Sequence, residues 1–374
     1  MTLILGIETS CDETSAAVVE DAGRVRSNVV ASQHELHSKY QGVVPEIASR
    51  AHLERITPVT DQALKSAGVQ LGDLDAIAVG NRPGLIGSLL VGVEAAKMLA
   101  WATNRPLIGI DHIQAHLYAA SLSSADQPEH ERQHGPAVTY PALGLVVSGG
   151  HTCLFEVVSS TTLSLLGQTI DDAVGEAYDK AAVILDAGYP GGPCVDRLAQ
   201  RGNPMAVAFP RSMLGETSLD FSFSGLKTSL LYTVRGQPQG RGRSRSFPFS
   251  AADLSENRRA DLAASFQAAA VDSLIIKIER AIDQLAQLGR TPTCLIIGGG
   301  VSANSLLRRR VVELGRKRGL PVHLPPLAYC LDNAAMIAGL AQQQYDQSRF
   351  DDLHLPALAS RVSAATSSSK KKRR

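Results

Sequence analysis

The amino-acid sequence predicts an α/β protein, and two observations carry that prediction. A strand–turn–strand pattern occurs twice: LILGI (3–7), the polar turn ETSCDET and SAAVVE are matched about 140 residues later by LGLVV (143–147), SGGHT and CLFEVV. Strand candidates also alternate with helix candidates along the chain, which is typical of α/β architectures. Together they predict two similar halves related by an internal duplication.

The individual elements follow from periodicity and turn residues. Apolar residues at helical spacing predict helices over 46–67, 87–102 and 259–288. A strand over 75–80 leads through NRPGLIGS into the second of these helices, and residues 294–319 form a further strand–turn–helix unit. Polar, Gly/Pro-rich composition predicts loops over 121–136 and 235–258, and the basic segment 360–374 is expected to be disordered.

Composition limits the classes of protein that fit. A chain of 374 residues is long enough for about two domains, and a net charge of +1 gives no overall attraction for polyanions. Five separated cysteines without a CxxC pair favour a reducing compartment over a disulfide framework or a cysteine-rich zinc site. No targeting segment and no apolar run of membrane-spanning length is evident, so we expect a cytoplasmic protein without a membrane span.

Two histidine pairs have the i, i+4 spacing of a helical metal site. The first, His130 and His134, lies in HERQH and matches the HExxH signature of zinc proteases. Pro128 before it and Gly135-Pro136 after it leave hardly more than one helical turn, so we interpret this pair as part of a solvated loop.

The second pair, His112 and His116 in DHIQAHLYAA, is the better candidate. It follows the apolar strand PLIGI (106–110), and Asp111 can cap a helix that carries both imidazoles on one face. Histidines buried for structural reasons remain an alternative on spacing alone. Ile113 occupies the position at which a zinc protease requires glutamate, so this pair lacks the base for that hydrolysis.

Three turns have the composition of nucleotide-binding loops. VSGGHT (147–152) and IGGGVSAN (297–304) allow close approach of the backbone to an anion. ETSCDET (8–14) offers hydroxyls and the carboxylates Glu8, Asp12 and Glu13, which suit a metal–phosphate or the positioning of a reactive amine. Each is weak alone, but three in a duplicated α/β chain indicate a nucleotide site.

These motifs, together with GVVPEIASRAH, IDDAVGEAYDKAA, YPGGP, DFSFSGLKT and LDNAAMIA, closely resemble the TsaD family over roughly residues 3–350, in its bacterial form. The family consists of tRNA adenosine threonylcarbamoyltransferases, formerly labelled O-sialoglycoprotein endopeptidases. The resemblance implies the actin/Hsp70/sugar-kinase (ASKHA) fold, with two duplicated domains whose mixed sheets are flanked by helices. It places the N-terminal subdomain at 1–110, completed by a helix around 333–348, and the C-terminal subdomain at 111–332, with the nucleotide and metal at the cleft between them.

The resemblance also implies a set of site residues. His112, His116 and Asp332 would ligate a divalent metal, with Fe(2+) expected and Zn(2+) as the alternative. Asp12 or Glu13 would position or deprotonate the attacking amine. The donor substrate, threonylcarbamoyl-AMP, would contact Val146, Val147, Ser148, Gly149, Gly150, Asp179, Gly192, Asp196 and Asn304.

The implied reaction transfers the threonylcarbamoyl group to the exocyclic amine of the adenosine 3′-adjacent to the anticodon in tRNAs that read codons beginning with A. Partners implied are tRNA, TsaB-like and TsaE-like proteins and an upstream TsaC/YrdC-like synthase. A metallopeptidase and a non-catalytic ASKHA scaffold are the rival interpretations.

The sequence departs from the family pattern in three places. Arg82 stands where many relatives have glycine, and the basic insert within 235–258 and the basic tail have no counterpart in the pattern. The insert and tail are interpreted as solvated segments, with contact to the phosphates of tRNA as the alternative. The arginine clusters 308–310 and 316–318 carry the same two interpretations.

Overall fold

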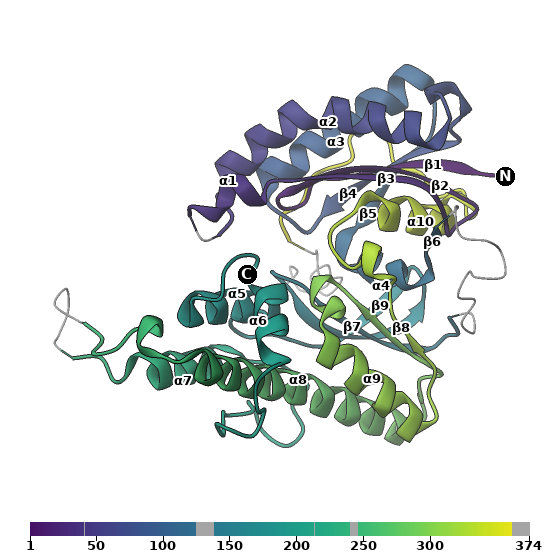
Figure 1. The fold of residues 1–374 in the computed structure, drawn as a ribbon. Helices are drawn as coiled ribbons and strands as arrows, with labels where there is room; N and C mark the ends of the chain where they lie inside the picture. Colours follow the sequence, from purple (N-terminus) through teal and green to yellow (C-terminus); the bar gives the residue numbers. More distant parts are fainter. Residues whose placement is uncertain (41, 125–137, 213, 240–245, 361–374) are drawn as a thin grey trace, which may run out of the picture. The chain divides into compact units, whose positions relative to one another are not determined.

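The computed structural model describes residues 1–40, 42–124, 138–212, 214–239 and 246–360. The chain divides into two compact units, one made of Met1–Ala115 with Asn333–Arg374 and the other of His116–Asp332. Figure 1 traces both along the sequence. The HERQH pair, Arg241, Arg243, Arg245 and the tail beyond residue 360 lie outside the described residues.

The first unit is built on a sheet whose strands within this unit have the order β5-β4-β1-β2-β3. The strand β1 pairs antiparallel with β2 and parallel with β4, which pairs parallel with β5. Its strands are β1 (Leu3–Glu8), β2 (Glu13–Glu20), β3 (Arg24–Ser32), β4 (Ala76–Arg82) and β5 (Leu107–Asp111).

Helices pack on the sheet of the first unit, with α2 and α3 on one face and α10 on the other (Figure 1). The core beneath α2 and α3 contains Leu5, Ile7, Val18 and Ile77, each fully buried. Full burial of such a side chain contributes about 1.5–3 kcal/mol. The helices are α1 (His34–Ser38), α2 (Pro45–Ala67), α3 (Ile86–Thr103) and α10 (Ala334–Tyr345), with α4 (His112–Tyr118) continuing from β5 into the second unit.

The helix α3 is long and apolar enough to cross a membrane, with a mean hydropathy of 1.3. Helices in the cores of soluble proteins pass the same test. Six of its residues, from Ser88 to Ala100, are buried at a spacing of one to four positions, and the helix packs on α2 and β4. This stripe is what an amphipathic helix that covers a sheet requires.

The second unit repeats the arrangement of the first. Its sheet has the order β11-β10-β7-β8-β9, in which β7 pairs antiparallel with β8 and parallel with β10, and β10 pairs parallel with β11. The strands of this sheet are β7 (Ala142–Val147), β8 (Thr152–Ser159), β9 (Thr162–Gln168), β10 (Leu295–Gly298) and β11 (Val322–His323). The short strand β6 (Ser123–Ser124) is not part of it. Its helices are α5 (Val174–Leu185), α6 (Gly191–Ala199), α7 (Ser224–Arg235), α8 (Glu256–Gln287) and α9 (Ser305–Arg318).

The matching strand orders confirm the predicted duplication, with β1, β2, β3, β4 and β5 corresponding to β7, β8, β9, β10 and β11. The predicted α/β class is likewise confirmed. The helices predicted over 46–67, 87–102 and 259–288 are α2, α3 and α8, displaced by at most three residues at their ends.

Candidate active site

The helix α4 begins where strand β5 ends, and Asp111 makes that junction. Its Oδ1 accepts hydrogen bonds from the backbone N–H groups of Ile113 (3.0 Å) and Gln114 (3.2 Å), the capping predicted from the sequence. Its Oδ2 lies 3.8 Å from Nε of Arg82, the residue that departs from the family pattern. Arg82 therefore acts on the residue that starts the histidine-bearing helix.

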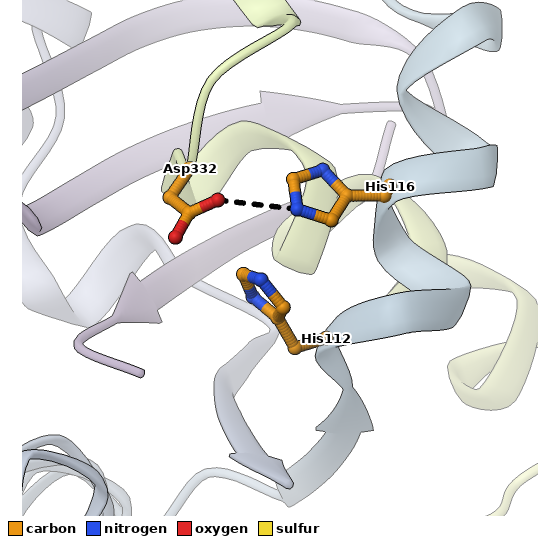
Figure 2. A group of neighbouring side chains, drawn as sticks. All are labelled: His112, His116 and Asp332. Atoms are coloured by element: carbon orange, nitrogen blue, oxygen red, sulfur yellow. Dashed lines mark ion pairs between the residues drawn. The ribbon is translucent and has the colours of Figure 1, made fainter. Parts of the chain in front are cut away.

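His112, His116 and Asp332 lie together (Figure 2). One ligand atom from each lies within 4.8 Å of the others, and Nε2 of His116 is 3.1 Å from Oδ1 of Asp332. Both imidazoles are buried. Two imidazoles and one carboxylate form a donor set that suits Fe(II) or Zn and leaves open positions for a substrate. The residues thus fit the metal that the sequence resemblance implies.

Glu8, one of the carboxylates that the sequence offers in ETSCDET, has a specific partner in the structure, His112. It is fully buried at the end of β1, and its Oε2 lies 3.1 Å from Nδ1 of His112, which is also 3.2 Å from Oγ of Ser10. A carboxylate that holds one ring nitrogen orients the other toward a metal and strengthens it as a ligand. The available signal was a carboxylate that ends an otherwise apolar strand.

The turn between β1 and β2, residues 9–12, is here called the acidic turn. Asp12 is its last residue and Glu13 begins β2; both side chains are buried. They form a group with His34, the first residue of α1. The structure therefore places the two predicted catalytic carboxylates side by side, with a histidine that was not predicted.

The turn between β7 and β8, residues 148–151, is here called the glycine turn. Ser148 and His151 close it by a backbone hydrogen bond of 2.8 Å, after the buried end of β7 at Val146 and Val147. Gly149 and Gly150 are exposed, neither has a positive φ, and a Cβ on either would meet no atom within 4 Å. Neither backbone conformation nor packing within the described residues requires glycine here. We therefore interpret the two glycines as leaving room for a ligand beside the backbone.

The glycines of IGGGVSAN have a structural reason instead. Gly299 has a φ of +90°, and a Cβ on Gly298 would lie 2.6 Å from the carbonyl carbon of His116. Both positions exclude a side chain without any ligand, so this motif reflects close packing of β10 on α4.

The remaining predicted substrate residues lie on α5, α6 and the start of α9. Asp179 accepts a hydrogen bond from the N–H of Gly191 at 3.0 Å, which fixes the start of α6. Gly192 is as open as the glycine turn, because a Cβ there would meet no atom within 4 Å. Asp179 thus holds the first residue of α6, and the next residue, Gly192, has open space where a side chain would be.

Asp196 and Asn304 are joined by Gln267, a residue of α8 that sequence reasoning missed. The side-chain nitrogen of Gln267 donates to Asp196 (3.0 Å), and its oxygen accepts from Asn304 (3.0 Å). Asn304 also caps α9 by accepting from Leu307 N at 2.9 Å. A buried glutamine within an apolar helical stripe was the available signal.

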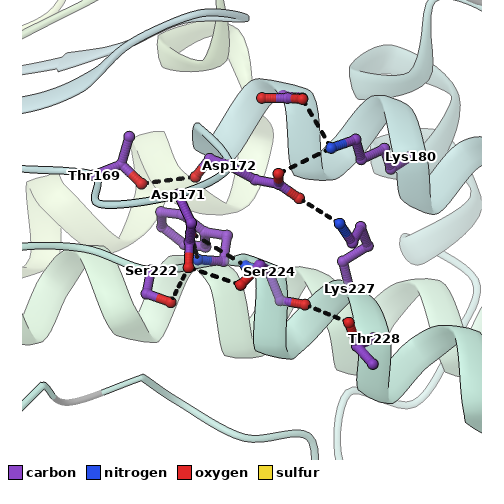
Figure 3. A network of polar contacts seen from close by, with 10 residues as sticks. Thr169, Asp171, Asp172, Lys180, Ser222, Ser224, Lys227 and Thr228 are labelled. Carbon is purple, nitrogen blue, oxygen red and sulfur yellow. Dashed lines mark hydrogen bonds and ion pairs between the residues drawn. The ribbon is translucent and has the colours of Figure 1, made fainter.

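A polar network joins the IDDAVGEAYDK and DFSFSGLKT motifs (Figure 3). Asp171 accepts from the hydroxyls of Ser222 and Ser224 at the start of α7, and Asp172 accepts from Lys180 (2.9 Å) and Lys227 (2.8 Å). Burial, the largest influence, acts to raise the pKa of Asp172, but the two lysines outweigh it and hold that pKa below 3.8. The network fixes the segment that follows β9.

The basic residues of α9 are partly neutralised. Arg310 pairs with Asp272 at 2.9 Å, Lys317 with Glu279 at 3.0 Å and Arg318 with Asp283 at 2.8 Å. These partners favour the interpretation as a solvated helix face over a phosphate-binding patch.

The sequence matches the profile of the TsaD family, described as tRNA N6-adenosine threonylcarbamoyltransferase, over residues 24–339. Proteins of that name from Moorella thermoacetica and Trichlorobacter lovleyi are 47% and 49% identical over 358 and 357 residues, covering 96% of this chain and 96% of each relative. A third, from Rhodopirellula baltica, is 47% identical and covers 94% of this chain and 95% of its own.

Among solved structures, HypF from T. kodakarensis is similar with a TM-score of 0.54 at 14% sequence identity, covering 92% of this chain and 48% of HypF. A full-length HypF in a phosphate- and nucleotide-bound form gives the same TM-score at 13% identity, over 94% of this chain and 47% of that one. At this identity the likeness concerns the fold alone, and the ASKHA class predicted from the sequence is confirmed.

Identity near one half over almost the whole length, together with the family profile, establishes the relationship. The chain is a transferase of tRNA modification and belongs to the TsaD family of tRNA N6-adenosine threonylcarbamoyltransferases.

Proposed function

We propose that this protein transfers the threonylcarbamoyl group from threonylcarbamoyl-AMP to N6 of the adenosine 3′-adjacent to the anticodon, in tRNAs that read codons beginning with A. The observation that carries the proposal is the grouping of His112, His116 and Asp332 in a chain that also keeps an open glycine turn. The names of the relatives support the reaction class.

The chemistry requires one bond to form and one to break. The adenosine amine attacks the activated carbonyl, a C–N bond forms, and the C–O bond to the phosphate breaks so that AMP leaves. Asp12 or Glu13 is proposed to position the amine or accept its proton. No nucleophilic side chain is required.

The donor is proposed to bind the second unit. Backbone N–H groups of Gly149 and Gly150 would face the oxygens of the activated carbonyl and phosphate, at a turn where a Cβ would meet no atom within 4 Å. Val146, Val147 and Ser148 lead into this turn. Asp179, Gly192, Asp196 and Asn304 are proposed to hold the adenosine part, with carboxylates accepting from ribose hydroxyls.

The metal is proposed to be Fe(2+), with Zn(2+) as the alternative, held by His112, His116 and Asp332. A metal ion there would supply Lewis-acid stabilisation of developing negative charge. Glu8 would keep His112 oriented for that role, at the 3.1 Å separation described above.

The wider setting is also proposed. The protein would act in the cytoplasm on tRNA, supplied with donor by a TsaC/YrdC-like synthase and assisted by TsaB-like and TsaE-like proteins. Peptidase activity has little support, because Ile113, where that chemistry needs a carboxylate, is a buried apolar residue.

The test is nucleoside mass spectrometry of tRNA from cells depleted of the protein. Loss of threonylcarbamoyladenosine is expected, with rescue by the wild type and by His354→Ala, an exposed histidine outside the site, but not by His116→Ala. Rescue by His116→Ala would contradict the role of the metal. In vitro transfer from synthetic threonylcarbamoyl-AMP to unmodified tRNA tests the donor separately.

A further inference from the structure

A second group of potential metal ligands lies entirely in the first unit and consists of Asp12, Glu13 and His34. The sheet brings them together. The strands β2 and β3 are antiparallel with Glu13 opposite Ser32, so the chain returns to the start of β2 just before α1 begins at His34. One ligand atom from each of the three residues lies within 4.8 Å of the others.

This group contains two carboxylates but only one imidazole that could carry a positive charge. Asp12 and Glu13 are each only 8% exposed. Glu13 has partners, because its Oε1 lies 3.2 Å from Nε2 of His34 and 3.4 Å from Oγ of Ser32. The carboxylate of Asp12 has no hydrogen bond or ion pair within the described parts of the chain. Two carboxylates thus share one imidazole, and a bound cation would supply further positive charge to the group.

His52, which interacts electrostatically with Asp12, does not supply a positive charge to this group. His52 hydrogen-bonds Thr14 and the carbonyl of Cys11, at 2.8 Å and 3.0 Å. Burial lowers the pKa of His52 below 6.5, against the opposing influence of that carbonyl and of the carboxylates Glu8 and Asp12. His52 is therefore neutral at neutral pH, and Arg55 donates instead to the backbone carbonyl of Ser32.

We infer that Asp12, Glu13 and His34 bind a second divalent cation, separate from the one proposed at His112, His116 and Asp332. Two carboxylates and one imidazole are a donor set for first-row divalent ions such as Mn(2+) or Zn(2+). The inference stands on this group alone and does not require the transfer reaction. Under the proposed function, the cation would fix the positions of the two carboxylates that are proposed to position the adenosine amine.

The test is metal stoichiometry in the full-length protein, stripped with chelator and titrated with Mn(2+), with unbound ion followed by electron paramagnetic resonance. Two bound ions per chain are expected for the wild type and for the control His354→Gln. One is expected for Asp12→Asn, for His34→Gln and for His116→Ala, and none for Asp12→Asn combined with His116→Ala.

The outcomes separate the two sites. Two ions retained by both Asp12→Asn and His34→Gln would overturn the inference, as would a single wild-type ion that His116→Ala removes. A single wild-type ion that Asp12→Asn removes and His116→Ala keeps would support the second site while contradicting the first. Circular dichroism confirms that each variant folds; His34, with 34% of its side chain exposed, is the milder substitution if Asp12→Asn does not fold.

Discussion

The acidic turn and the glycine turn lie at equivalent places in the two sheets, since each joins the first two strands of its copy. In the acidic turn, the flanking carboxylates Glu8 and Glu13 are buried and paired with His112 and His34. In the glycine turn, Gly149 and Gly150 are exposed and no atom lies near their missing side chains. One scaffold thus provides a turn flanked by buried carboxylates and a turn of exposed glycines.

The largest effect is expected from closing the glycine turn. Gly150→Val should lower threonylcarbamoyl transfer by about 10²–10³-fold, because a side chain there blocks approach to backbone donors. Stability should change by no more than about 0.5 kcal/mol, since the new Cβ meets open space. Assay of transfer alongside thermal unfolding measures both. The control is Gly72→Val, because a Cβ on Gly72 also meets no atom within 4 Å and Gly72 lies outside the site. Equal transfer activity of the two variants would show that the reaction does not need the open space at Gly150.

The next effect concerns the carboxylate that enters the acidic turn. Glu8→Gln should weaken metal binding at His112 by about 10–100-fold, because the neutral amide no longer polarises the imidazole. Isothermal titration with Zn(2+) measures it. Glu20→Gln, a buried glutamate of the same sheet paired with Arg24 and Arg26, should leave the affinity unchanged. Equal losses in both variants would point to a general effect on the sheet.

A smaller effect distinguishes structural glycines from open ones. Gly298→Ala should destabilise the protein by about 1–3 kcal/mol, because its Cβ would lie 2.6 Å from the carbonyl carbon of His116. Gly149→Ala should change stability by less than about 0.5 kcal/mol. Urea unfolding of the two variants measures the difference, and a similar loss in both would show that the glycine turn is also held by packing.

The smallest effect concerns the network beside the glycine turn. The folded pKa of Asp172 is below 3.8, so its contribution to stability is complete above the unfolded pKa and is lost as pH falls through the folded value. Asp172→Asn should therefore cost about 1 kcal/mol or less at pH 7, and less as the pH falls below 3.8. Unfolding by urea at several pH values measures this, and an equal cost at both extremes would mean that the carboxylate charge is irrelevant.

Local patterns predicted the helices, the duplicated hairpins and the cap at Asp111, because each depends on residues close in sequence. The grouping of Asp332 with His112 and His116 came from the family resemblance, since no periodicity links positions so far apart. His34 and Gln267 were missed for the same reason, because each acts through a partner that only tertiary packing brings near. Glu8 was a candidate carboxylate, but its partner His112 could not be predicted from the sequence. The loop 297–304 was interpreted as a ligand loop, although packing against His116 and a positive φ explain Gly298 and Gly299.

The amide of Gln267 has a direction: its nitrogen faces an acceptor on Asp196 and its oxygen faces a donor on Asn304. Exchange for glutamate preserves the shape but sets oxygen against oxygen at the Asp196 end. This single-atom change would therefore break the link between Asp196 on α6 and Asn304 at the start of α9. Position 267 should consequently tolerate fewer substitutions than its place inside a long helix would suggest.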